Sequence, residues 1–198
     1  MNRILPIVLT GGPGGGKTTL MNELRAEDPH GKKWILVPEA APLLFRAWLD
    51  GRTKSFQRAV VRLQIALEEA CATAAASRKI LLCHRGTLDP LAYWLRNGWD
   101  ENEFFDYIGM TREEHHQRYF GVIHLQTAAI GAEAYYRRWP DAHRPETVIH
   151  AAEIDSLCAH AWQKHHRYVL INNVNNNWPN KARIARDLII GWLTSASK

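Results

Sequence analysis

Eight residues near the start of the chain constrain its fold more than any other stretch. Residues 11–18 read Gly-Gly-Pro-Gly-Gly-Gly-Lys-Thr and match the pattern G-x-x-x-x-G-K-[ST] at every fixed position. The apolar run Ile4–Leu9 before them has the length of a strand, and Thr18–Arg25 after them has leucines four residues apart, as in a helix. A strand, a glycine loop and a helix in this order predict a phosphate-binding loop.

Each residue type in this loop has a physical reason to be there. Glycine lets consecutive backbone N–H groups turn inward towards an anion, and the start of a helix adds the positive end of its dipole. Lys17 would bridge the β- and γ-phosphates, and the Thr18 hydroxyl would ligate Mg²⁺. A dinucleotide fingerprint starting at Gly12 is disfavoured, because Lys17 would take the place of its last glycine. The expected nucleotide-binding residues are Gly11, Gly12, Pro13, Gly14, Gly15, Gly16, Lys17, Thr18 and Thr19.

Composition limits the class of protein further. The 198 residues are 46% hydrophobic, which is enough for a single domain over residues 1–198 with a small lid. The net charge of +5 suits an anionic ligand such as a nucleotide and is too small to indicate nucleic acid. Three scattered cysteines fit a reducing compartment, and no apolar stretch is long enough to cross a bilayer. We therefore expect a cytoplasmic protein.

Further strands are expected after the loop, each followed by residues suited to a site. The expected strands are Lys33–Val37, Lys79–Cys83, Tyr119–Gln126 and Tyr168–Ile171, and a long helix, Phe56–Ala76, is expected with Ser55 as its cap. In parallel α/β sheets, ligands bind beyond the carboxyl ends of strands. Glu39 follows such an end, where it would take a proton from a substrate hydroxyl or hold Mg²⁺ through water. The alternative is a surface carboxylate that begins the next helix.

The third expected strand runs into His84-Arg85-Gly86. In phosphate-loop enzymes an acid that assists Mg²⁺ usually closes such a strand, but here the position holds His84. Asp89 lies five positions later and is the candidate replacement for that acid as a metal ligand, while Arg85 is placed to clamp phosphate or substrate. The alternatives are a helix cap for Asp89, with Pro90 at the first helical position, and a structural ion pair for Arg85.

Residues 132–146 form a candidate lid. The segment is basic and aromatic, is interrupted by prolines, and follows the end of the fourth expected strand. Arginine suits a lid over phosphates, because its planar side chain stays charged and can hold two oxygens. An ordinary exposed basic loop is the alternative.

Several short motifs together resemble a known family. They are the glycine loop GGPGGGKTT, V-P-E-A-A after the second strand, F-Q-R in the long helix, H-R-G-x-x-D-x-x-A-Y from His84, V-I-H-L in the fourth strand and a later R-P-E. The chain resembles the small AAA_28-type P-loop NTPase and kinase family, which is similar to nicotinamide riboside kinases and, more distantly, to nucleoside and nucleotide kinases.

The resemblance implies a fold and a set of site residues. The fold is an α/β P-loop NTPase three-layer sandwich, with a five-stranded parallel sheet of order 2-3-1-4-5 and helices on both faces. Glu39, Arg85 and Asp89 would face the site, and Arg144 would belong to the lid. Relatives often carry an acid where this chain has His84, and some are described as GTP-binding regulators that also bind lipid.

Two hypotheses follow. The first is a kinase that uses ATP (or GTP) and Mg²⁺ to phosphorylate a small, hydroxyl-bearing, nucleoside-like metabolite. Its catalytic residues would be Lys17, Glu39, Arg85, Asp89 and Arg144, with Thr18 and Asp89 at the metal. The second is a regulatory NTPase that switches with its nucleotide, binds a partner or an anionic lipid surface, and hydrolyses slowly. The residues leave open whether Glu39 or Asp89 is the base.

Overall fold

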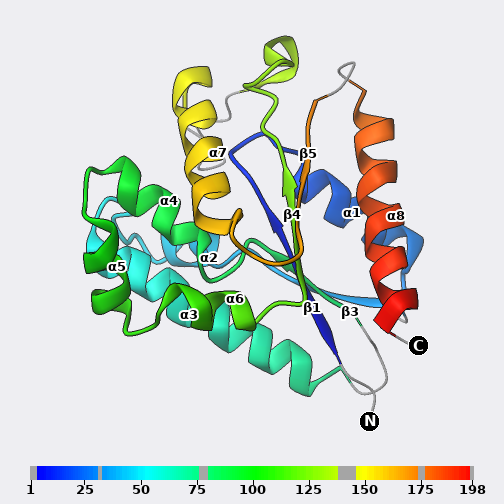
Figure 1. Cartoon of the computed structure of the whole chain (residues 1–198), viewed down its shortest axis with the longest axis horizontal. Coiled ribbons are helices and arrows are strands. Elements are labelled where there is room, and N and C mark those ends of the chain that lie inside the picture. Colours follow the sequence, from blue (N-terminus) through cyan, green and yellow to red (C-terminus); the bar gives the residue numbers. More distant parts are fainter. Residues whose placement is uncertain (1–3, 31–32, 76–79, 138–145, 174–176, 197–198) are drawn as a thin grey trace.

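A single sheet of parallel strands forms the centre of the computed structural model, which describes residues 4–30, 33–75, 80–137, 146–173 and 177–196 (Figure 1). The strands are β1 (Leu5–Thr10), β2 (Trp34–Val37), β3 (Ile80–His84), β4 (Gly121–Leu125) and β5 (Tyr168–Ile171). Their order is β2-β3-β1-β4-β5, and every neighbouring pair is parallel. The expected strand order is therefore confirmed.

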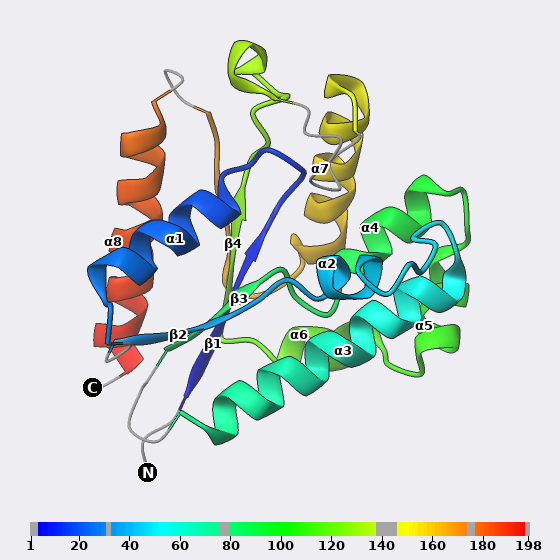
Figure 2. The same cartoon turned by 180° about the vertical axis from the view of Figure 1, so that it is seen from behind.

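Helices lie on both sides of this sheet, which makes the three layers that were expected. On one side are α1 (Lys17–Glu27) and α8 (Trp178–Ala196) (Figures 1 and 2). On the other side are α2 (Ala40–Phe45), α3 (Lys54–Thr73), α4 (Asp89–Arg96), α5 (Glu101–Ile108), α6 (Arg112–Gln117) and α7 (Val148–Trp162). A 3-10 turn, η1 (Glu133–Tyr135), follows β4.

The central strand shows why the sequence folds into layers. Ile7 and Leu9 of β1 belong to the cluster that includes Leu20 and Leu24 of α1, whereas Val8 belongs to the cluster on the opposite face. All three strand residues are fully buried. A parallel strand covered on both faces must be apolar at every position, and this explains the continuous apolar run in the sequence.

Two helix starts differ from expectation. Thr53, not Ser55, caps α3, because its hydroxyl accepts a hydrogen bond from the Phe56 N–H while Ser55 is already helical. Asp89 is the first residue of α4 and Leu88 is its cap, with no side-chain capping bond. The reading of Asp89 as a helix cap is therefore wrong, and its carboxylate is used elsewhere.

Within the described part of the chain, no helix combines the length and the apolar sequence that crossing a bilayer requires. Cys71, Cys83 and Cys158 are free thiols.

Candidate active site

The glycine loop after β1 has a backbone that other residues would disrupt. Gly11, Gly14 and Gly16 have positive φ angles of 119°, 77° and 94°. A Cβ atom on Gly11 would lie 2.3 Å from the Leu125 carbonyl oxygen, and one on Gly16 would lie 2.0 Å from the Trp178 ring. Glycine is needed at these positions both for the backbone conformation and for the close packing.

A carboxylate from α7 holds the loop from behind. Oδ1 of Asp155 accepts hydrogen bonds from the N–H groups of Gly12 (2.7 Å) and Thr127 (2.9 Å), and Oδ2 lies 3.1 Å from Nε2 of His124. Burial raises the pKa of Asp155, but His124 and the two N–H donors outweigh that effect and lower it. No local pattern in the sequence indicates this role, because Asp155 is 143 positions away from Gly12.

Lys17 lies across the mouth of the loop. Its Nζ donates to the carbonyl oxygens of Gly11 (2.7 Å) and Gly12 (2.9 Å). Burial and the nearby Arg85 lower the pKa of Lys17 to about 7. Gly16 precedes α1 and offers no side-chain cap, so the first N–H groups of this helix need another partner. A phosphate group would satisfy these N–H groups and favour the charged form of Lys17, so the loop fits the anion that its sequence predicts.

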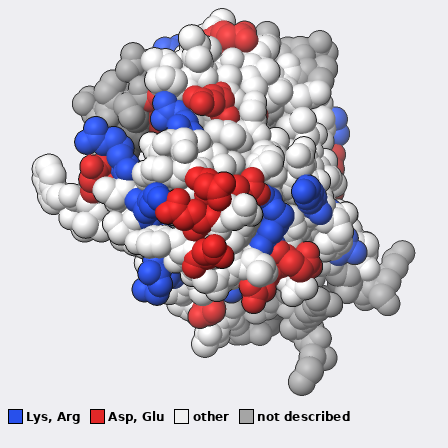
Figure 3. Space-filling view, turned by 60° about the vertical axis from the view of Figure 1, so that its left-hand side comes forward, with Lys and Arg blue, Asp and Glu red and all other residues white. Residues whose placement is uncertain are grey.

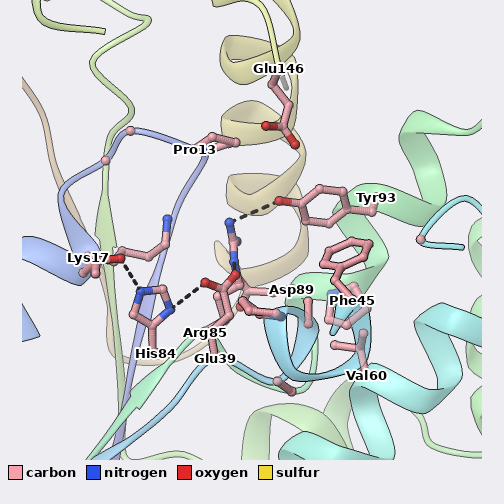
Figure 4. A pocket seen from close by; sticks show the side chains of 18 of the residues that line it. Pro13, Lys17, Glu39, Phe45, Val60, His84, Arg85, Asp89, Tyr93 and Glu146 are labelled. Atoms are coloured by element: carbon pink, nitrogen blue, oxygen red, sulfur yellow. Dashed lines mark hydrogen bonds and ion pairs between the residues drawn. The ribbon is translucent and has the colours of Figure 1, made fainter. Parts of the chain in front are cut away.

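Arg85 connects the loop to the neighbouring strand ends. It follows β3 in the left-handed region, with a φ of 69° that costs a non-glycine residue energy. Its Nε donates to Oε1 of Glu39 (2.6 Å), and its Nη1 donates to Oδ1 of Asp89 (2.9 Å) and to the Gly11 carbonyl (3.2 Å). Its Nη2 donates to the Tyr93 hydroxyl (3.2 Å) (Figure 4). These bonds fix the guanidinium beside the phosphate loop.

Glu39 is the carboxylate at the end of β2. It occupies the cap position of α2 without making a capping hydrogen bond, and its side chain instead meets Arg85. Burial raises the pKa of Glu39, but His84, Arg85 and Lys17 outweigh it and lower the pKa to about 2. The side chain keeps 26% of its surface exposed, so a ligand in the cavity can reach an ionised carboxylate.

His84 ends β3 between the loop and Glu39. Its Nε2 is 2.9 Å from the Thr18 hydroxyl oxygen, and its Nδ1 is 3.3 Å from Oε2 of Glu39 (Figure 4). Burial lowers the pKa of His84 to about 4, despite the opposite effect of Glu39. The imidazole is therefore neutral at physiological pH.

Asp89 is almost completely buried and uses both of its carboxylate oxygens. Oδ1 accepts from the Thr10 hydroxyl and from Arg85 (2.9 Å each). Oδ2 accepts from the Gly86 N–H (2.9 Å) and from the Trp162 indole (3.0 Å). Its role as metal ligand or base stays a prediction, and these four bonds weigh against it, because a metal would have to displace at least one donor.

A cavity of about 720 Å³ joins these groups. The phosphate loop, Glu39, His84 and Arg85 line one part, and residues of α2, α3 and α4 line another. The second part combines apolar side chains with the polar side chains Gln57, Gln64 and Arg96. Its Phe45 and Phe56 rings stack with centroids 4.8 Å apart. A volume of this size with a few convergent polar groups is typical of a small-molecule site.

The candidate lid is described only in part. Tyr135, Arg137 and Glu146 line the cavity, so both described ends of segment 132–146 reach it. Oε2 of Glu146 is buried and has no hydrogen-bond partner within the described ranges. Arg144 lies outside the described residues, so its place in a lid stays a prediction.

The residues present fit a magnesium ion that is bound together with a nucleotide. The described residues contain no group of three His, Cys, Asp or Glu side chains that could hold a metal alone. Mg²⁺ usually takes one or two protein oxygens and completes its shell with phosphate oxygens and water. The Thr18 hydroxyl would supply such a ligand from the loop side of the cavity, and Glu39 would reach the ion through a water molecule.

A glycine loop between the central strand and α1, in a sheet of order β2-β3-β1-β4-β5, defines a P-loop nucleotide-binding fold of the kinase type. The model of the AAA_28 family, described as an AAA domain, matches residues 6–181, so the chain belongs to the AAA_28 family.

Among solved structures, the chain is similar to deoxyadenosine kinase from M. mycoides with bound dATP. The two have a TM-score of 0.61 and 14% sequence identity, over 93% of this chain and 99% of the kinase chain. At that identity the likeness concerns the fold alone. A comparison with curated proteins gave no match.

Proposed function

We propose that the protein is a kinase that transfers the γ-phosphoryl group of ATP, or of GTP, to a hydroxyl group of a small metabolite. The observation that carries this proposal is the continuity of the cavity. Lys17 and Thr18 of the phosphate loop line the same space as Glu39, Arg85 and the apolar wall beyond them. A protein that only binds and hydrolyses a nucleotide needs no second compartment next to the phosphates.

The proposed roles follow from charge and position. In phosphoryl transfer, negative charge is spread over the moving group, so catalysis is mostly positioning and neutralisation. Lys17 and the loop N–H groups would hold the β- and γ-phosphates, and Arg85 would face the transferred group from the acceptor side. Bound Mg²⁺ would supply further positive charge at the phosphate oxygens.

Glu39 would orient the acceptor hydroxyl. A carboxylate with a pKa of about 2 is a weak base, so it would not remove the proton early in the reaction. A loose transition state does not need early removal, because the acceptor forms little of its new bond before the phosphoryl group has left the donor. Glu39 would therefore accept a hydrogen bond from the hydroxyl and take its proton as the new P–O bond completes.

The shape of the acceptor compartment favours a nucleoside-like molecule. The stacked Phe45 and Phe56 rings, with Val60 beside them, would pack against a planar ring, while Glu39 and Arg85 would meet a hydroxyl. The deoxyadenosine kinase of similar fold is consistent with this class of acceptor.

The regulatory alternative has less support. Figure 3 shows Lys and Arg interspersed with Asp and Glu on the face towards the left of Figure 1, with acidic side chains gathered near its centre. That face offers no broad basic surface for an anionic membrane. We propose a single kinase domain over residues 1–198 that acts in the cytoplasm.

A metabolite screen tests the proposal. The full chain would be incubated with ATP or GTP and Mg²⁺ and with a panel of nucleosides and other small hydroxyl-bearing metabolites, and release of the nucleoside diphosphate would be measured. A kinase predicts that one class of acceptor raises release tens of times above the basal rate, with a phosphorylated product detected by mass spectrometry. Tight GTP binding with no stimulation by any acceptor would favour the regulatory switch instead.

A further inference from the structure

His84 occupies a position that the sequence pattern reserves for an acid. It is the last residue of β3 and is only 7% exposed. Its ring lies between Thr18, the first hydroxyl-bearing residue of α1, and Glu39 at the end of β2. Figure 4 shows the dashed contacts on both sides of the ring. The ring therefore links the position of the Thr18 hydroxyl to the position of the Glu39 carboxylate.

The contacts decide which nitrogen of His84 carries the proton. Nδ1 is buried, is 3.3 Å from a Glu39 carboxylate oxygen, and has no aligned hydrogen bond within the described residues. If Nδ1 were unprotonated, its lone pair would face a carboxylate oxygen, and two acceptors would repel each other. Of the two tautomers with one ring proton, the contacts therefore favour the one with the proton on Nδ1, in which Nε2 is the acceptor that faces Thr18.

A metal ligand at Thr18 benefits from such an acceptor. A hydroxyl group has one proton and two lone pairs. When the Thr18 hydroxyl donates its hydrogen bond to Nε2 of His84 at 2.9 Å, the lone pairs of the hydroxyl oxygen remain available to a cation. Partners of this kind, one step behind a ligand, fix its orientation and strengthen metal binding.

We propose that His84 is the positioning residue of the metal site. Its Nε2, 2.9 Å from the Thr18 hydroxyl oxygen, takes the place of the carboxylate oxygen that an acid at the end of this strand would supply. The inference rests on the proposed function, because it needs Thr18 to meet the metal of a bound nucleotide.

The replacement of an acid by a histidine also suits Glu39. A carboxylate at position 84 would lie next to Oε2 of Glu39, where the imidazole is 3.3 Å away, and two negative charges at that distance repel. An imidazole carries no negative charge, so it lets Glu39 approach the loop and keep its 2.6 Å bond to Arg85. His84 can therefore accept the hydrogen bond from Thr18 while the Glu39 carboxylate lies next to it without charge repulsion.

The test compares His84→Gln with His84→Asn. Both replacements are polar and uncharged, but only glutamine is long enough to place an oxygen near the former Nε2, whereas asparagine reaches only the position of Nδ1. His115→Gln is the matched control, because the His115 ring is also buried and also lies 2.9 Å from a threonine hydroxyl, that of Thr87, away from the cavity. For each full-length variant, ATP affinity would be measured by calorimetry with saturating Mg²⁺ and with excess EDTA. The ratio of the two affinities reports the contribution of the metal and does not depend on turnover.

We expect His84→Asn to reduce this ratio about tenfold, as loss of a partner behind a metal ligand does, with little change of affinity in EDTA. His84→Gln should keep most of the ratio, and His115→Gln should keep all of it. An unchanged ratio in His84→Asn, or equal losses in the Asn and Gln variants, would overturn the proposal. If the wild-type chain bound ATP in neither condition, the proposed function itself would fail, which is a different result.

Discussion

At the scale of single residues, the site is built from side chains that fix one another. Arg85 has a strained backbone, and its guanidinium is held by Glu39, Asp89, Tyr93 and the Gly11 carbonyl. Arg85 does form ion pairs with Glu39 and Asp89, as the structural alternative expects. These pairs lie in the wall of the cavity and not on the surface. In the proposed kinase the two roles of Arg85 would coincide, because a cation that faces the transferred phosphoryl group must be held in place.

The first prediction concerns Lys17. At an ATP concentration about a hundred times its dissociation constant, with Mg²⁺, the wild-type melting temperature should rise by about 5–10 °C. Lys17→Ala should abolish this rise, because the variant loses the side chain that would meet the β- and γ-phosphates. Lys164→Ala changes an exposed lysine and should melt like the wild type with and without nucleotide. Differential scanning fluorimetry measures both, and an undiminished rise in Lys17→Ala would remove the loop from the nucleotide site.

The second prediction separates binding from chemistry at Glu39. Glu39→Gln should bind ATP nearly as well as the wild type, yet transfer phosphate to the acceptor about 100-fold or more slowly, since the amide cannot take a proton. Glu69→Gln makes the same chemical change on an exposed position of α3 and should be fully active. Steady-state kinetics with the acceptor found in the screen would measure this, and full turnover in Glu39→Gln would exclude the assigned role.

At the scale of elements, the phosphate loop depends on a helix from the far end of the chain. The Trp178 ring at the start of α8 packs on Gly16, and its indole N–H donates to Glu23 of α1 (2.8 Å). On the other side of the loop, the Tyr136 ring after η1 packs on Gly14. The loop is therefore held between an early helix and two later segments.

The third prediction tests that packing. Gly16→Ala and Gly109→Ala both put a Cβ on a residue with positive φ, but only at Gly16 does the new atom meet a ring, whereas nothing lies within 4 Å at Gly109. The clash should make Gly16→Ala less stable than Gly109→Ala by about 1–3 kcal/mol, the usual cost of overpacking. Gly16→Ala should also weaken ATP binding. Urea unfolding and calorimetry would check both, and equal stabilities would mean that Trp178 moves away without cost.

At the scale of the whole molecule, the site forms where strand ends from distant parts of the sequence meet. β1 supplies the loop, β2 supplies Glu39, β3 supplies His84 and Arg85, and α7 supplies Asp155. Buried polar groups also lie in the core, away from the site. One of them is His115, whose Nε2 has no hydrogen-bond partner within the described residues.

The fourth prediction is a pH dependence of stability that comes from this core. Burial, Arg118 and His116 lower the pKa of His115 to about 4, from 6.5 in an unfolded chain. Between pH 6.5 and 4 the unfolded state therefore binds more protons than the folded state, so stability falls as the pH falls through this range. His115→Gln should remove a slope of up to about 1.4 kcal/mol per pH unit from the acid side of the curve. Urea titrations from pH 7 to 4 would measure this, and parallel curves for both proteins would contradict it.

The sequence alone predicted the features that depend on local chemistry. The glycine loop, the strands and most helices follow from residues close to one another, because hydrogen-bonding geometry and apolar period act over a few positions. Glu39 and Arg85 were expected at the site because each lies two positions beyond an expected apolar strand, and parallel strands place such ends at one edge of the sheet.

Only the tertiary structure decided which side chains meet there. Asp155 and Trp178 support the loop from far along the chain. Asp89 lines the cavity, but both of its carboxylate oxygens accept hydrogen bonds from Thr10, Arg85, Gly86 and Trp162. His84 lies between Thr18 and Glu39 through contacts that join three separate strand ends. Such contacts leave no local pattern, since the energy that fixes them comes from burial and pairing across the folded sheet.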